Sequence, residues 1–126
     1  MKRTKAKIKP AQKLPKGIDS TYELEYLNIL NSQKQQGLIL DYIIKPCSLR
    51  LGNGCHYEPD FMVITSEGFI EFHEIKGNTR FAQKSLTKLK AAAYIFQIFT
   101  FRLCWGNPVK GPDGKKKLEF DIKEIE

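Results

Sequence analysis

The sequence predicts a mixed α/β fold in which helices cover both faces of a central β-sheet. Two apolar runs, residues 61–65 and 69–75, flank the turn residues Ser66-Glu67-Gly68 and predict an antiparallel hairpin. Apolar side chains alternate onto both of its faces: Met62, Ile64, Ile70 and Phe72 on one, Phe61, Val63, Phe69 and Ile75 on the other. A sheet that is apolar on both sides must be covered on both sides, and helical patterns before and after the hairpin can provide that cover.

The first helix is predicted over residues 20 to about 36. Leu24, Leu27 and Leu30 recur at helical spacing, and Gly37 follows as a stop signal. A strand is predicted next over residues 38–46, with a continuation through residues 49–51. Asn53-Gly54 then marks a turn before the hairpin.

The second helix is predicted over residues 82 to about 96, where an apolar face alternates with lysines. A strand is predicted over residues 99–105, and residues 118–122 are expected to pair with it across a connection that contains Gly111-Pro112-Asp113-Gly114. The aromatic residues of this region follow helix and strand periodicity and are predicted to be core, not a base-stacking platform: Phe96, Phe99, Phe101 and Trp105.

Composition indicates one domain in a reducing compartment. The 126 residues are 41% hydrophobic, enough for a core, and no apolar run has the length of a membrane span or a signal peptide. We therefore expect a cytoplasmic protein that does not associate with a membrane. Cys47, Cys55 and Cys104 cannot all pair within one chain, so free thiols are expected. Cys47 and Cys55 with His56 match no standard zinc spacing.

The net charge of +7 is concentrated at the N-terminus. Residues 1–17 contain seven Lys and Arg and no acidic residue, which leaves 14 basic and 14 acidic residues in residues 18–126. Such a block predicts a disordered arm before a single domain at residues 18–126. The arm suits contact with nucleic-acid phosphates, and a merely solubilising terminus is an equal alternative. The arm residues expected to contact DNA are Lys2, Arg3, Lys5 and Lys7.

Two carboxylates are predicted to face each other in the hairpin. If Glu67 is the centre of the turn, Asp60 and Glu74 lie directly opposite, because each is seven residues from it. Like charges placed so are destabilising, so we expect a cation between them, most simply a divalent ion such as Mg²⁺. Lys76 lies on the same face of the strand as Glu74.

These residues resemble a known family. Pro59-Asp60, 13 intervening residues and Glu74-Ile75-Lys76 resemble the PD-(D/E)XK signature of the restriction-endonuclease-like nuclease superfamily, over residues 19–102. The chain is most similar to small phage and prophage nuclease-like proteins and to phage junction resolvases. That similarity rests on Ile18-Asp19-Ser20 with Glu23, and on Glu74-Ile75-Lys76-Gly77 with the later run of residues 88–93.

The resemblance implies a restriction-endonuclease-like core and a Mg²⁺-dependent endonuclease, with Mn²⁺ able to substitute, that hydrolyses DNA, including branched or junction DNA. By resemblance, Asp60 and Glu74 bind the metal with the Ile75 carbonyl, Lys76 acts at the attacking water or scissile phosphate, and Glu23 completes the acidic cluster. A chain this small cannot easily enclose a duplex, so we expect a homodimer.

Several alternatives stay open. Glu23 also fits a capping box after Ser20, with Glu25 as another acid on that helix, and Glu74-x-Lys76 also fits a solvated ion pair. His73 is expected to be packed or at the surface. Helix lysines are equally consistent with phosphate contact and with simple solvation: Lys84, Lys88 and Lys90. Other functions are a nucleic-acid-binding adaptor with little or no activity, and a structural protein whose basic arm binds an acidic partner.

Overall fold

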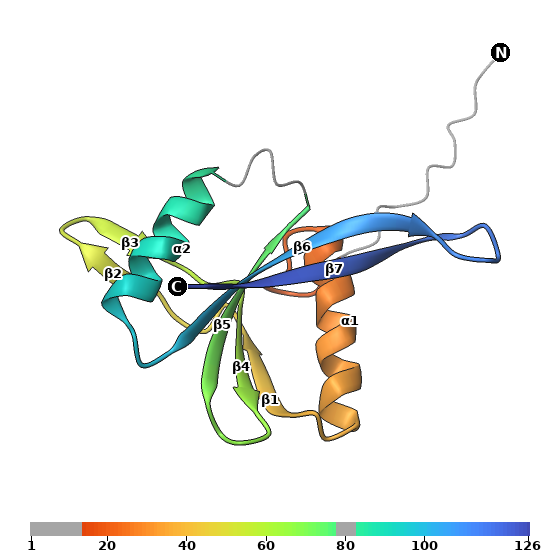
Figure 1. The fold of residues 1–126 in the computed structure, drawn as a ribbon, viewed down its shortest axis with the longest axis horizontal. Helices are drawn as coiled ribbons and strands as arrows, with labels where there is room; N and C mark the ends of the chain where they lie inside the picture. The colour runs from red at the N-terminus through yellow and green to blue at the C-terminus, as the bar shows by residue number, and fades with distance from the viewer. Residues whose placement is uncertain (1–13, 78–82) are drawn as a thin grey trace, which may run out of the picture.

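The computed structural model describes residues 14–77 and 83–126 and confirms the α/β class. The elements in chain order are α1 (Thr21–Gln35), β1 (Ile39–Ile44), β2 (Leu49–Gly52), β3 (Cys55–Tyr57), β4 (Phe61–Thr65), β5 (Ile70–Lys76), α2 (Gln83–Ile95), β6 (Thr100–Lys110) and β7 (Lys116–Ile125). A five-stranded sheet and a separate two-stranded hairpin hold all the described strands. Figure 1 shows the two helices well apart, α2 beside the small hairpin and α1 beneath the long β6–β7 hairpin.

The large sheet is mixed. Its strand order is β1-β4-β5-β6-β7, and every neighbouring pair is antiparallel except β5 and β6, which are parallel and are joined through α2. In the central hairpin Phe61 pairs with His73 and Ile64 with Ile70, so the hairpin is centred on Glu67, as predicted. One further step in this register sets Asp60 opposite Glu74.

The core has one cluster on each face of the sheet. Tyr26, Leu27 and Leu30 of α1 pack on one face against side chains that include Phe61 and Ile75. Leu89 and Ala92 of α2 pack on the other face, in a cluster that includes Phe72, Phe101 and the partly buried Phe96, Phe99 and Trp105. The predicted cover on both faces and the assignment of the aromatic residues to the core are confirmed.

Phe69 is an exception to the predicted apolar pattern. We expected it to face the core, but its side chain is 65% exposed. Its amide donates to Oγ1 of Thr65, and its carbonyl accepts from the Thr65 amide. Phe69 therefore closes the hairpin turn with its backbone, and β5 begins only at Ile70.

Residues 49–51 form a strand, β2, but this strand does not continue β1, so that part of the prediction is wrong. β1 ends at Ile44, and Lys45 has a φ of 46°, a left-handed conformation that few non-glycine residues adopt. The chain then turns, and β2 pairs with β3 as a hairpin on the α2 side. β6 and β7 are longer than expected, which shortens their connection to residues 111–115.

The structure describes only the last residues of the predicted basic arm. Most of the predicted arm, including Lys2, Arg3, Lys5 and Lys7, lies outside the described residues. Within the arm, Leu14 packs against the α1 cluster, and the Ile18 amide donates to the Pro15 carbonyl.

All three cysteines are free thiols, with Cys104 buried. No helix in the described residues is long and apolar enough to cross a membrane.

Candidate active site

Asp60 is buried where β4 begins, and backbone groups on both sides hold it. The amide of Ile75 in β5 donates to Oδ2 of Asp60 at 2.8 Å. The amide of Lys45, just after β1, donates to the Asp60 carbonyl at 2.9 Å. The carboxylate is therefore fixed at one end of the three adjacent strands β1, β4 and β5.

A lysine that the sequence analysis did not single out provides the cation at Asp60. Nζ of Lys45 lies 2.6 Å from Oδ1 of Asp60, 3.5 Å from Oε1 of Glu23 and 3.6 Å from Oδ2 of Asp19. Burial lowers the pKa of Lys45, but the bond to Asp60 and the other carboxylates outweigh it, and the net shift is upward. The sequence carries no local signal for this contact, because it depends on the pairing of Ile44 with Phe61, whose next step sets Lys45 opposite Asp60.

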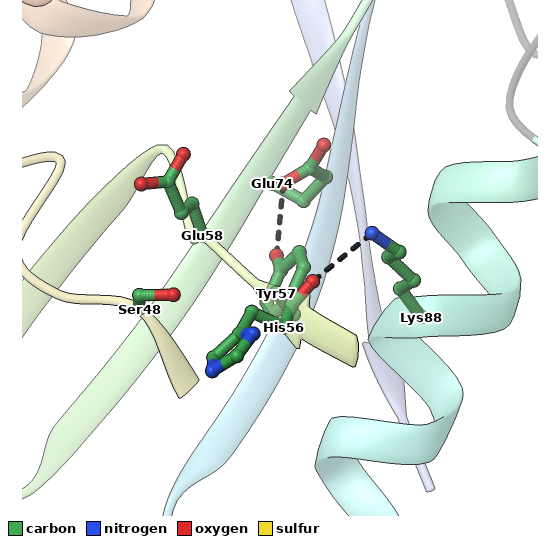
Figure 2. A pocket seen from close by; sticks show the side chains of 6 residues that line it. All are labelled: Ser48, His56, Tyr57, Glu58, Glu74 and Lys88. Atoms are coloured by element: carbon green, nitrogen blue, oxygen red, sulfur yellow. Dashed lines mark hydrogen bonds between the residues drawn. The ribbon is translucent and has the colours of Figure 1, made fainter. Parts of the chain in front are cut away.

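Glu74 is buried on β5 with two partners. The hydroxyl of Tyr57 donates to Oε1 at 2.8 Å (Figure 2). Nζ of Lys76 lies 3.3 Å from Oε2. Burial, together with the nearby charge of Asp60, raises the pKa of Glu74 to about 7. The predicted proximity of Glu74 and Lys76 is confirmed. Burial is the largest cause of the Glu74 pKa shift, because a charged carboxylate is disfavoured where water is excluded.

Glu23 caps α1 and also lies in the acidic cluster. Its amide donates to Oγ of Ser20, and its Oε1 accepts from the Asp19 amide at 3.1 Å, so it takes part in capping α1. The same carboxylate is buried and lies within ion-pair distance of Lys45. Burial and the charge of Asp60 raise its pKa. Its place in the acidic cluster is thus established, while metal binding by Glu23 stays a prediction.

A pocket of about 550 Å³ opens beside Glu74. Its lining residues come from the positions just before β2, in and just after β3, in β5 and in α2, and are Ser48, His56, Tyr57, Glu58, Glu74 and Lys88. Figure 2 shows Lys88 reaching from α2 to the His56 carbonyl, to which it donates at 3.0 Å. Lys90 is exposed on the same helix. Lys84 lies in α2, and its side chain is outside the described part of the structure.

His73 is packed, as predicted, and lies away from the acidic cluster. Its Nδ1 is 2.6 Å from the hydroxyl of Tyr26, and its Nε2 is 2.9 Å from Oε1 of Glu71. Arg102 donates to both oxygens of Glu71. These four residues form a separate polar network beneath α1 and have no part in the candidate site.

The donor chemistry suits a hard divalent ion. Asp60, Glu74 and the Ile75 carbonyl are oxygen donors, and Mg²⁺ commonly uses one or two carboxylates together with substrate phosphate and water. Each carboxylate oxygen has one partner, which leaves further lone pairs for a ligand. Within the described residues, no group of three or more His, Cys, Asp or Glu side chains is placed so that it could hold a metal ion.

Comparison with known proteins adds no family assignment. The chain matches no protein-family model, no curated protein and no solved structure. The function must therefore be inferred from the geometry of the site.

Proposed function

We propose that this protein is a Mg²⁺-dependent endonuclease of the PD-(D/E)XK type that hydrolyses DNA phosphodiester bonds, including those of branched or junction DNA. One observation carries the proposal: two buried carboxylates, Asp60 and Glu74, end the central hairpin opposite each other, with Lys76 3.3 Å from Glu74. Burying two like charges in one place is costly unless a cation is bound there.

The topology supports a restriction-endonuclease-like core. A helix precedes the antiparallel strands β1, β4 and β5, and α2 then leads to β6, which is parallel to β5. Asp60 and Glu74 lie at one end of the central strands, and a pocket that Glu74 lines gives this carboxylate access to solvent. This is the arrangement expected from the resemblance in the motif residues.

Each residue has a defined role in the proposed reaction. A divalent ion, when bound, supplies Lewis-acid stabilisation of the phosphate and lowers the pKa of a water molecule. Asp60 and Glu74 hold the ion, and the Ile75 amide fixes the orientation of Asp60. Lys76 stabilises negative charge on the scissile phosphate or orients the water, and Tyr57 orients Glu74 by donating to Oε1.

A cleavage assay with plasmid, single-stranded, flap and four-way junction DNA in Mg²⁺, Mn²⁺ or EDTA tests the proposal. We expect cleavage only with metal, and a loss of at least about 100-fold in Asp60→Asn, Glu74→Gln and Lys76→Met. Glu67→Gln is the matched control, because Glu67 is an exposed carboxylate in the turn of the same hairpin. Full activity of Asp60→Asn in Mg²⁺ would refute the mechanism.

We further propose that the active form is a homodimer, because a symmetric pair of sites suits a duplex or a junction. Sedimentation of the protein with and without junction DNA tests this point separately. Cleavage by a strictly monomeric protein would contradict the dimer and leave the chemistry intact.

The second candidate function is a nucleic-acid-binding adaptor that keeps this fold without cleaving DNA. One observation favours it: Lys45 already neutralises Asp60 at 2.6 Å, so the Asp60 carboxylate has a cation without a metal. The two functions differ in a single measurement, since an adaptor binds DNA equally well in Mg²⁺ and in EDTA and leaves every DNA form uncut.

A further inference from the structure

The β6–β7 hairpin continues beyond the rest of the sheet. The last pair between β5 and β6 joins Lys76 to Trp105, whereas β6 runs on to Lys110 and pairs only with β7. Five residues of β6 therefore extend past the end of β5, a reach of about 17 Å at a typical rise per residue. Figure 1 shows this two-stranded ribbon, residues 106–120, projecting from the body above α1.

The end of the ribbon carries unpaired positive charge. Lys110 and Lys116 face each other directly in the last pair of the ladder, and Lys115 and Lys117 adjoin them. All four are exposed, and none forms an ion pair with a carboxylate of the described residues. Like charges directly opposed across two strands are destabilising, so this end of the ribbon lacks an anion.

Asp113, the acidic residue in the turn, stabilises the turn itself. Oδ1 of Asp113 accepts from the Lys115 amide at 3.0 Å, while the Gly111 amide donates to the Lys115 carbonyl and Gly114 adopts a φ of 78°. These contacts define a tight turn at Gly111-Pro112-Asp113-Gly114. These contacts fix the backbone of the turn between the lysines, and none of the four lysines lies within ion-pair distance of Asp113.

We propose that this ribbon is a DNA-binding arm whose four lysines contact the phosphate backbone of duplex DNA next to the cleaved bond. A two-stranded ribbon fits the major groove of B-DNA, which is about 12 Å wide. The ribbon leaves the sheet beside Lys76, so a duplex held at the acidic cluster lies within its reach. The inference rests on the proposed function for its substrate, and it assigns a surface that the nuclease signature does not include.

Binding of the protein to a duplex in EDTA, measured by fluorescence anisotropy over a range of salt concentrations, tests the arm without cleavage. Each phosphate contact contributes about 0.9 to the slope of log affinity against log salt. Replacing Lys110, Lys115, Lys116 and Lys117 together with Gln is therefore expected to reduce that slope by roughly 3 to 4. Lys123→Gln is the matched control, because Lys123 is an exposed lysine of β7 within the sheet, paired with Leu103. An unchanged slope in the fourfold variant overturns the proposal.

A second measurement uses the wild-type protein and does not depend on how a variant folds. Acetylation of lysines with and without duplex DNA, followed by mass spectrometry, should show protection of the four arm lysines and continued reaction at Lys123. Equal reactivity of the arm lysines in the two samples overturns the proposal.

The substitution Lys116→Glu distinguishes a DNA-binding arm from a hairpin that only stabilises the fold. It replaces the repulsion with an attraction to Lys110, so the melting temperature should rise while affinity for the duplex falls. A rise in melting temperature without weaker binding overturns the proposal. Because all binding is measured in EDTA, failure of the arm is distinguishable from failure of the endonuclease, which is judged by cleavage in Mg²⁺.

Discussion

Nζ of Lys45 lies 2.6 Å from Oδ1 of Asp60, although the two residues are 15 positions apart in the chain. The ammonium group is partly buried and is also within 4 Å of carboxylate oxygens of Glu23 and Asp19. In the described protein this lysine balances the charge of Asp60 and partly offsets those of Glu23 and Asp19. A metal ion bound by Asp60 must therefore compete with an ammonium group that belongs to the chain.

We predict that Lys45→Met destabilises the metal-free protein and strengthens metal binding. The variant leaves the buried Asp60 carboxylate without its cation, which should lower the free energy of unfolding by about 1.5–3 kcal/mol. Mg²⁺ should restore more stability to the variant than to the wild type, as thermal denaturation at increasing Mg²⁺ would show. Lys34→Met is the control, because its ion pair with Asp41 is half exposed. A Mg²⁺-induced shift no larger than that of the wild type would contradict competition.

We predict that the metal-free protein loses stability as the pH rises from about 4.5 to about 7. The pKa of Glu74 is raised from 4.5 in the unfolded chain to about 7 in the fold, so the folded state binds the proton more tightly. The stabilisation is complete below pH 4.5 and is lost as the pH passes 7, with a total effect on the order of 3 kcal/mol. Urea denaturation across this range measures it.

Glu74→Gln provides the control for that pH dependence. Glutamine cannot ionise, so the variant should lack this part of the slope and be the more stable protein at pH 8. Parallel pH profiles for the wild type and the variant would show that another group is responsible.

We predict that Gly77→Ala is destabilising while Gly52→Ala is tolerated. A Cβ at Gly77 would overlap the ring of Tyr22, whereas a Cβ at Gly52 meets nothing within 4 Å, and neither glycine has a positive φ. Overpacking of this kind costs about 1–3 kcal/mol. The melting temperatures of the two variants test it, and equal values would mean that Tyr22 moves aside freely. Because Tyr22 precedes Glu23, we also expect Gly77→Ala to reduce cleavage.

We predict that the network around His73 supports the fold and not the reaction. Tyr26→Phe removes the partner of a buried imidazole nitrogen and should lower the free energy of unfolding by about 1–2 kcal/mol, with cleavage per folded molecule unchanged. Tyr42→Phe is the control, since the hydroxyl of Tyr42 bonds to Asn31 at an exposed position. A large loss of cleavage in folded Tyr26→Phe would show that the network belongs to the site.

The sequence predicted the central hairpin and its acidic pair because both follow from local patterns. Alternating apolar residues around Glu67 set the register, and the register set Asp60 opposite Glu74. Lys45 was missed because its position depends on the pairing of β1 with β4, which local pattern does not specify. The left-handed conformation of Lys45, which ends β1, was also not predicted, because apolar residues resume at Leu49 and suggested one continuous strand.

The ribbon was missed for a related reason. Apolar alternation weakens after Trp105, and residues 106–110 contain Gly106, Asn107 and Pro108, which are unfavourable in strands. Their strand conformation comes from pairing with β7. Gly106 itself is needed because a Cβ there would press against the rings of Tyr22 and Phe120. Such a tertiary contact is not visible in a sequence pattern.

The parallel pairing of β5 with β6 affects the order in which the sheet is expected to fold. Both hydrogen bonds that hold the Asp60 side chain span 15 residues, and they involve strands paired antiparallel. The parallel pairing of β5 with β6 joins Glu71 to Thr100 and must close a longer loop, which costs more chain entropy. We therefore expect the acidic cluster to form in the folding transition state before β6 and β7 join the sheet. Folding rates of substitutions in β4 and in β6 can measure this order, and slower folding caused mainly by changes in β6 would reverse it.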